Sequence, residues 1–175
     1  MWITLQQLER NPVRFSVSVR PDDIEFATEL TQISALTAEG SAVLINHAVG
    51  EIRVQGRVDV EMSAACDRCL EAVRLPVRSD FDLVYLPADE SGGGEHEVEQ
   101  AAIEVGFYEG SGLELNDILR EVVLLALPMQ VVCDQACKGI CPVCGQNRNG
   151  ASCDCQTGTT DDRWSKLKDF RPRTA

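Results

Sequence analysis

Eight cysteines are the residues of this sequence most able to do chemistry, and they come as four close pairs. In chain order the pairs are Cys66/Cys69, Cys133/Cys137, Cys141/Cys144 and Cys153/Cys155. Three pairs fall within residues 133–155, around a Cys-Pro-Val-Cys-Gly segment whose Pro and Gly favour a tight turn. Backbone N–H groups in such a turn can point at the two sulfurs, which suits tetrahedral zinc at Zn–S distances of about 2.3 Å. The spacing therefore favours structural metal ligands over disulfides or free buried thiols.

The number of thiols predicts two zinc ions, because four thiolates complete one structural site. Joining the third and fourth pairs closes only the short loop 145–152, at low entropic cost. The first pair would then meet the second. One ion, held by the third pair and one other pair, is the alternative, and the Cys-x-Cys spacing of the fourth pair is the least conventional. Asn147 and Asn149 in the closed loop suit turn positions with positive φ.

A Cys-x-x-Cys pair such as Cys66/Cys69 also occurs in redox dithiols. A thioredoxin-like dithiol lies where a strand leads into a helix, whereas this pair has a predicted strand on each side, so redox catalysis is disfavoured. The two histidines, His47 and His96, have no Ser or Cys partner in a recognisable motif. With no visible nucleophile–base pair or open metal site, we do not predict an enzyme.

The composition is that of a globular protein of ordinary size. The chain has 175 residues, of which 44% are hydrophobic and only 5% aromatic, so its core must be mostly Val, Leu, Ile and Ala. The first five residues lack the basic start and apolar stretch of a signal peptide, and the apolar run 122–127 is too short to span a membrane. We therefore expect a cytoplasmic protein with no membrane partner. In that reducing compartment, paired cysteines favour metal over disulfides.

The charge is strongly acidic and unevenly distributed. The net charge is −12, with 9 basic and 23 acidic residues in 1–132 but 7 basic and 5 acidic residues in 133–175. An acidic body repels a phosphate backbone over most of its surface. If nucleic acid binds, we expect it at the C-terminal end or on the arginine-bearing strands.

Alternating apolar and polar residues predict a mostly antiparallel sheet. We expect strands at residues 1–5, 13–20, 33–37, 42–45, 52–62, 73–85 and 101–107, with a turn or brief helix at 5–10. One face of strand 52–62 would be exposed to solvent and would carry Arg53, Arg57, Asp59 and Glu61. Cys66 and Cys69 would lie at the turn between the two longest strands.

A helix is predicted over residues 115–127, ended by Pro128. Asn116 is the expected N-cap, and Asp117 suits the positive first turn. Apolar residues at 118, 119, 122, 123, 125 and 126 form a wide stripe, which predicts burial against the sheet. The fold class predicted is therefore α+β: a twisted antiparallel sheet that could close toward a barrel, one buried helix, and a Cys-rich zinc-binding C-terminal appendage.

Three regions are expected: an antiparallel β domain with the helix (1–132), a Cys-rich zinc region (133–156), and a linker with a basic C-terminal helix or tail (157–175). Trp164, Leu167 and Phe170 lie at i, i+3 and i+6 in the last region. Its basic residues are candidates for RNA binding, namely Arg163, Lys166, Lys168, Arg171 and Arg173. The aromatic residues could equally dock the tail on the body.

Several of these motifs resemble the YceD family of large ribosomal RNA subunit accumulation proteins. The motifs are Cys66-Asp-Arg-Cys69-Leu70, Leu124-Leu-Ala-Leu-Pro128, the segment Cys137–Asn149, and Asp162-Arg163-Trp164-x-x-Leu167-Lys168. The resemblance implies a non-enzymatic role in the accumulation or processing of 23S ribosomal RNA and its precursor, with that RNA or a basic ribosomal protein as partner. It carries over no catalytic residue. An acidic protein-interaction adaptor without RNA contact and a zinc-thiol redox sensor are the alternatives.

Overall fold

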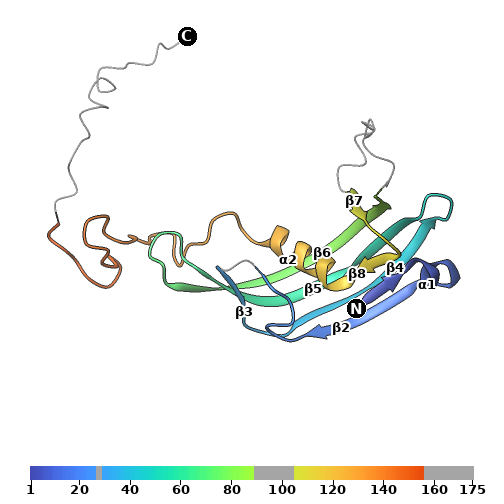
Figure 1. Ribbon diagram of the computed structural model, residues 1–175. Helices are drawn as coiled ribbons and strands as arrows, with labels where there is room; N and C mark the ends of the chain where they lie inside the picture. Colours follow the sequence, from blue (N-terminus) through green and yellow to red (C-terminus); the bar gives the residue numbers. More distant parts are fainter. Residues whose placement is uncertain (27–28, 89–104, 156–175) are drawn as a thin grey trace, which may run out of the picture.

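The computed structural model describes residues 1–26, 29–88 and 105–155. These residues form a long curved sheet with a helix on one face and the Cys-rich segment beyond one end (Figure 1). In chain order the elements are β1 (Trp2–Thr4), α1 (Leu5–Arg10), β2 (Val13–Val19), β3 (Leu30–Gln32), β4 (Leu36–Asn46), β5 (Glu51–Ala65), β6 (Ala72–Pro87), β7 (Val105–Tyr108), β8 (Gly112–Glu114) and α2 (Leu115–Ala126). The main sheet has the order β2-β4-β5-β6-β7, with β3 also paired to β5, while β1 and β8 form a separate pair.

The expected closure toward a barrel is wrong, and the sheet is not wholly antiparallel. Among the described strands, β2 and β7 are the two ends of the main sheet and do not pair with each other. β7 runs parallel to β6, an arrangement that requires a long connection between the two strands. Alternation along one strand predicts which face is buried, but it does not predict the direction of a neighbouring strand.

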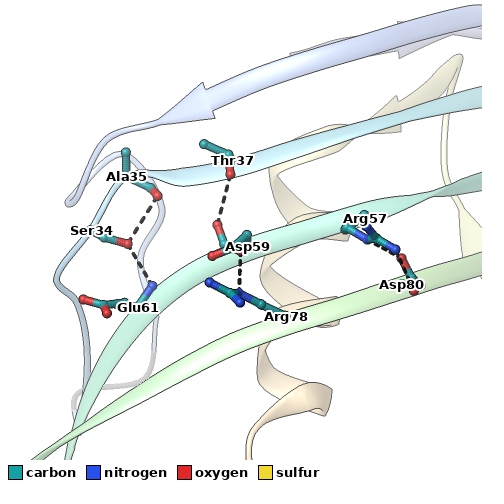
Figure 2. Close-up of polar contacts among 8 residues, drawn as sticks. All are labelled: Ser34, Ala35, Thr37, Arg57, Asp59, Glu61, Arg78 and Asp80. Atoms are coloured by element: carbon teal, nitrogen blue, oxygen red, sulfur yellow. Dashed lines mark hydrogen bonds and ion pairs between the residues drawn. The ribbon is translucent and has the colours of Figure 1, made fainter.

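The strand expected at residues 33–37 is wrong in its first three residues, because 33–35 turn the corner between β3 and β4, whereas Leu36 and Thr37 begin β4. The Ser34 hydroxyl accepts the backbone N–H of Glu61 and donates to the Ala35 carbonyl (Figure 2). The buried Gln32 amide donates to the carbonyls of Val19 and Ser34. Side-chain hydrogen bonds of this kind compete with a regular strand ladder.

The two faces of β5 differ as the alternation predicts. Ile52, Val54, Val58, Val60 and Met62 are buried on one face. The other face carries exposed ion pairs with β6, in which Arg57 contacts Asp80 and Arg78 contacts Asp59 (Figure 2). Each of these two pairs joins residues directly opposite each other in the ladder, so the charges agree with the observed register.

Helix α2 packs its apolar side against β6, β5 and β8. Its N-cap is Glu114, which makes no capping side-chain bond, so the prediction of Asn116 was wrong by two residues, whereas Asp117 does lie in the first turn. The buried residues are Leu115, Ile118, Leu119, Val122 and Val123. Leu125 is 75% exposed, so the buried stripe ends a turn earlier than predicted. No helix within the described residues is both long and apolar enough to cross a membrane.

Candidate metal centres

The first cysteine pair lies at the tip of the longest hairpin, where β5 ends and β6 begins. The sulfur of Cys66 accepts backbone N–H groups from Arg68 and, across the chain, from Cys133, at 3.5 and 3.4 Å. Leu70 has φ +64, the left-handed conformation that lets the chain turn back into β6. A turn whose backbone N–H groups point at sulfur can supply two of the four ligands of a thiolate metal site.

The second pair reaches this hairpin tip because the segment after α2 is bonded to it. Asp67 pairs with Val131 twice, once through its own backbone N–H and once through its carboxylate, which accepts the Val131 N–H at 2.8 Å. The Arg68 guanidinium donates to the carbonyls of Gln135 and Cys137. These bonds hold the chain that follows Pro128 alongside residues 66–69.

Cluster 1 consists of Cys66, Cys69, Cys133 and Cys137, whose four sulfurs all lie within 4.8 Å of one another. The Cys66–Cys137 and Cys69–Cys133 sulfur separations are 4.0 and 3.6 Å. Sulfurs placed tetrahedrally about zinc at about 2.3 Å would be about 3.8 Å apart. The sulfurs are therefore spaced for a common metal ion and are too far apart for disulfides.

Cluster 2 consists of Cys141, Cys144, Cys153 and Cys155, again with all sulfurs within 4.8 Å. The Cys141 backbone accepts from Gly145 N–H and donates to Gln146, and Gly145 has φ +73. Gly145 thus occupies the same place after its Cys-x-x-Cys pair as Leu70 does in cluster 1. Clusters 1 and 2 are the two groups of four cysteines predicted from the sequence. All four positions of each cluster are protein sulfurs, so each could hold one metal ion.

Hydrogen bonds tune the thiols within each cluster. Burial raises the pKa of Cys66, but the backbone N–H groups of Arg68 and Cys133 outweigh this effect and bring its pKa down to about 6. The backbone N–H groups of Cys144 and Val143 likewise lower the pKa of Cys141 to about 6. Thiolates at these two positions are the form that binds a metal ion.

The other thiols show the proton sharing expected of closely packed sulfurs. Contact with Cys137 raises the pKa of Cys133 to about 12, and contact with Cys144 raises the pKa of Cys155 to about 12. Several adjacent thiolates repel one another unless a cation lies between them. Each cluster could therefore hold a metal ion, whose binding would release the shared protons.

Sequence reasoning missed the polar residues that join the two clusters. The Asn149 amide donates to the Cys137 sulfur at 3.2 Å, and the Asn147 amide donates to the Glu71 carboxylate at 2.8 Å. The prediction of positive φ at these asparagines was wrong, because Asp22 and Leu70 are the only non-glycine residues with positive φ among those described. An Asn-x-Asn motif that begins three residues after the predicted ligand Cys144 was the available signal.

The predicted RNA-binding residues lie outside the described part of the chain. This holds for all five, namely Arg163, Lys166, Lys168, Arg171 and Arg173. The arginines of the sheet are described, and three of them are paired with aspartates across β5 and β6.

Comparison with known proteins gives one family. The model of the family "Large ribosomal RNA subunit accumulation protein YceD" matches residues 54–171, which include every cysteine of the chain. A protein of Arabidopsis thaliana described as large ribosomal RNA subunit accumulation protein YCED homolog 1, chloroplastic, is 24% identical over 151 residues. That match covers 69% of this chain and 44% of the relative, so the chain spans less than half of the relative's length. No solved structure matches the chain.

Proposed function

The chain belongs to the YceD family of large ribosomal RNA subunit accumulation proteins, and from this membership we propose that it is a non-enzymatic, zinc-containing factor for large ribosomal subunit biogenesis. In this proposal it promotes the accumulation or processing of 23S ribosomal RNA by binding that RNA or a ribosomal protein. The observation that carries the proposal is the pair of four-cysteine clusters inside the region that matches the family.

Zinc is the metal that the ligands favour. Thiolates are soft ligands, and four of them in a tetrahedral arrangement suit zinc or iron. Sites closed by four protein ligands leave no position for a substrate or a reactive water, which supports a structural role. Each ion would fix one Cys-x-x-Cys turn against a second segment. The two ions together would fix the surface formed by residues 66–71 and 131–155.

Ion pairs make three arginines of the sheet less available for contact with RNA. The guanidinium groups of Arg53 and Arg57 each bond an aspartate carboxylate of β6. An arginine already paired with a carboxylate must give up that bond to contact a phosphate. We therefore propose that the basic residues among 163–173 make the RNA contact.

The test is complementation in the host organism. A strain lacking the protein is expected to contain less mature 23S ribosomal RNA, and the intact gene is expected to restore it. The double change Cys66→Ser and Cys69→Ser should fail to restore it, because cluster 1 loses two ligands. Val143→Ser is the matched control, since Val143 is 62% exposed in the other turn and is not a sulfur ligand. Restoration of 23S ribosomal RNA by the cysteine variant would contradict the proposal.

Binding measurements separate the three kinds of function. Salt-dependent binding of 23S ribosomal RNA that is lost in Arg171→Glu and Arg173→Glu supports direct RNA contact. Binding of a basic protein that survives those changes, but not Glu95→Gln, Glu97→Gln and Glu99→Gln, identifies an adaptor. Reversible disulfides with zinc release under mild peroxide identify a redox sensor.

A further inference from the structure

Cluster 1 and cluster 2 are joined by a short, close-fitting connection. Only residues 138–140 separate Cys137 of cluster 1 from Cys141 of cluster 2. Gly139 has φ +70, and a Cβ there would lie 2.9 Å from the Arg68 carbonyl oxygen. The neighbouring Ile140 N–H donates to that same carbonyl at 2.9 Å. The turn that carries Cys66 and Cys69 is therefore hydrogen-bonded directly to residue 140, which precedes the first ligand of cluster 2.

The loop that closes cluster 2 bonds back to cluster 1. This loop, residues 145–152, runs between the ligands Cys144 and Cys153. Within it, the Asn149 Nδ2 donates to the Cys137 sulfur at 3.2 Å while its Oδ1 accepts the Lys138 N–H at 2.8 Å. Because the oxygen is needed by Lys138, the NH2 group must face the sulfur.

A second asparagine holds the same loop in place. The Asn147 Oδ1 accepts the Asn149 N–H at 2.9 Å, and its amide donates to Glu71, just after the first turn. The Arg148 N–H also donates to the Gly139 carbonyl. The position of Asn149 against the cluster 1 sulfur thus depends on the whole loop being ordered. A metal ion in cluster 2 would order the loop by holding Cys144 and Cys153 together.

We propose that the two clusters bind metal cooperatively and that Asn149 is the positioning residue that couples them. This inference rests on the proposed metal-containing function. An ion in cluster 2 fixes the loop, the fixed loop presents the Asn149 NH2 to Cys137, and that hydrogen bond stabilises the thiolate bound to the ion in cluster 1. Outer hydrogen bonds to metal ligands commonly change metal affinity by about 10–100-fold. Because coupling is reciprocal, filling cluster 1 must strengthen cluster 2 by the same factor.

The experiment uses Cd²⁺ and the full-length chain. Each cluster should give its own ¹¹³Cd resonance, and competition with a chelator, followed at each resonance, gives the two affinities. The main variant is Asn149→Asp, which keeps an oxygen for Lys138 but has no N–H for the Cys137 sulfur. Arg148→Leu is the control, because it changes the same loop without removing a described hydrogen bond. Cys153→Ser with Cys155→Ser empties cluster 2 and assigns the remaining resonance.

We expect Asn149→Asp to weaken Cd²⁺ binding at both clusters by about 10-fold or more and to shift the cluster 1 resonance, while Arg148→Leu changes neither. Emptying cluster 2 should weaken cluster 1 to a similar extent, and adding Asn149→Asp to that variant should have little further effect. Two resonances with unchanged affinities in Asn149→Asp would overturn the coupling alone. Fewer than two resonances in the intact protein would overturn the two-metal proposal itself, and the coupling with it.

Discussion

At the residue scale, the two Cys-x-x-Cys turns adopt the same left-handed backbone conformation with different residues. Both turns need a left-handed residue after the second cysteine, which is Gly145 at φ +73 in one and Leu70 at φ +64 in the other. Glycine takes this conformation without strain, whereas in a residue with a Cβ the same conformation costs about 1–2 kcal/mol of stability. Leu70 also leaves 64% of its surface exposed, so it gains little from burial. Leu70 is therefore a strained and solvent-exposed position beside cluster 1.

This strain predicts opposite effects for two substitutions of Leu70. Asn tolerates the left-handed region, so Leu70→Asn should raise the free energy of unfolding by about 0.5–1 kcal/mol. A β-branched residue is less suited to positive φ, so Leu70→Val should lower it. Chemical denaturation of the metal-loaded protein measures both changes. Equal shifts of the same sign would show that backbone strain at residue 70 does not matter.

At the element scale, two glycines allow the long strands of the sheet to approach under two aromatic rings. Gly40 and Gly56 are directly paired across β4 and β5, and their outer neighbours in the same row are Phe15 and Phe81. A Cβ on Gly56 would lie 2.4 Å from the Glu39 carbonyl oxygen and 2.9 Å from the Phe81 ring. The rings therefore occupy the space that side chains at residues 40 and 56 would need.

Gly56→Ala is accordingly expected to destabilise the protein, although Ala normally suits a strand better than Gly. Overpacking typically costs about 1–3 kcal/mol, and here the nearest atom belongs to the backbone and cannot rotate away. The free energy of unfolding measured by urea titration should fall by about that amount. Gln55→Ala on the exposed face of the same strand is the control, with an expected change within about 0.5 kcal/mol. A stabilising Gly56→Ala would contradict this packing.

The ion pairs on the open face of the sheet predict the titration of individual carboxylates. Hydrogen bonding to Arg53 lowers the pKa of Asp82, and hydrogen bonding to Arg57 lowers the pKa of Asp80. A lowered pKa stabilises the fold above the unfolded-state pKa, and this stabilisation is lost as pH falls through the folded value. Because both carboxylates are exposed, solvent screening keeps the effect on stability small.

In an NMR titration, Arg53→Gln should raise the pKa of Asp82 toward its ordinary value and leave that of Asp80 lowered. Arg57→Gln should do the reverse, so each carboxylate serves as the control for the other. If either variant raised the pKa of Asp80 and of Asp82 by similar amounts, the carboxylates would respond to the summed charge of the face and not to their own arginine partners.

The sequence predicted local features of these elements better than their arrangement. The alternation in β2, β5 and β6 predicted the strands and their buried faces, because side-chain direction has a period of two. The parallel pairing of β7 with β6 and the open sheet could not be predicted, since they depend on which strands meet in space. The N-cap of α2 was missed because β8 leads directly into the helix at Glu114.

In the candidate metal centres, too, the cysteine groups were predicted but the contacts between distant segments were not. Cysteine spacing and loop length predicted the two groups of sulfurs, because a short loop joins the two pairs of cluster 2 and leaves the other two pairs for cluster 1. The bonds of Asn149 to Cys137 and of Asn147 to Glu71 join segments whose contact depends on the folded hairpin tip. These bonds therefore became visible only with the fold.

At the scale of the whole molecule, the sheet and the Cys-rich region have separate cores. The main core contains residues of the sheet and α2, while Cys66, Cys69 and Cys137 form a second small core with Val73 and Val132. So small a core contributes little burial, and metal–thiolate bonds would have to supply most of its stability.

Removing the metal should therefore unfold one region and spare the other. After treatment with a chelator, hydrogen exchange of backbone amides should become fast in residues 137–149. Amides of β5 residues such as Val54 and Val58, which are fully buried in the main core, should stay protected. Loss of protection throughout β5 would show that the sheet depends on the metal as well.

The most direct test of the central claim is the metal content of protein purified without added metal, measured by native mass spectrometry with a count of reactive thiols. We predict two zinc ions per chain and eight shielded thiols, all of which become reactive after chelation. A chain that carries no metal, with its cysteines reactive from the start, would contradict it.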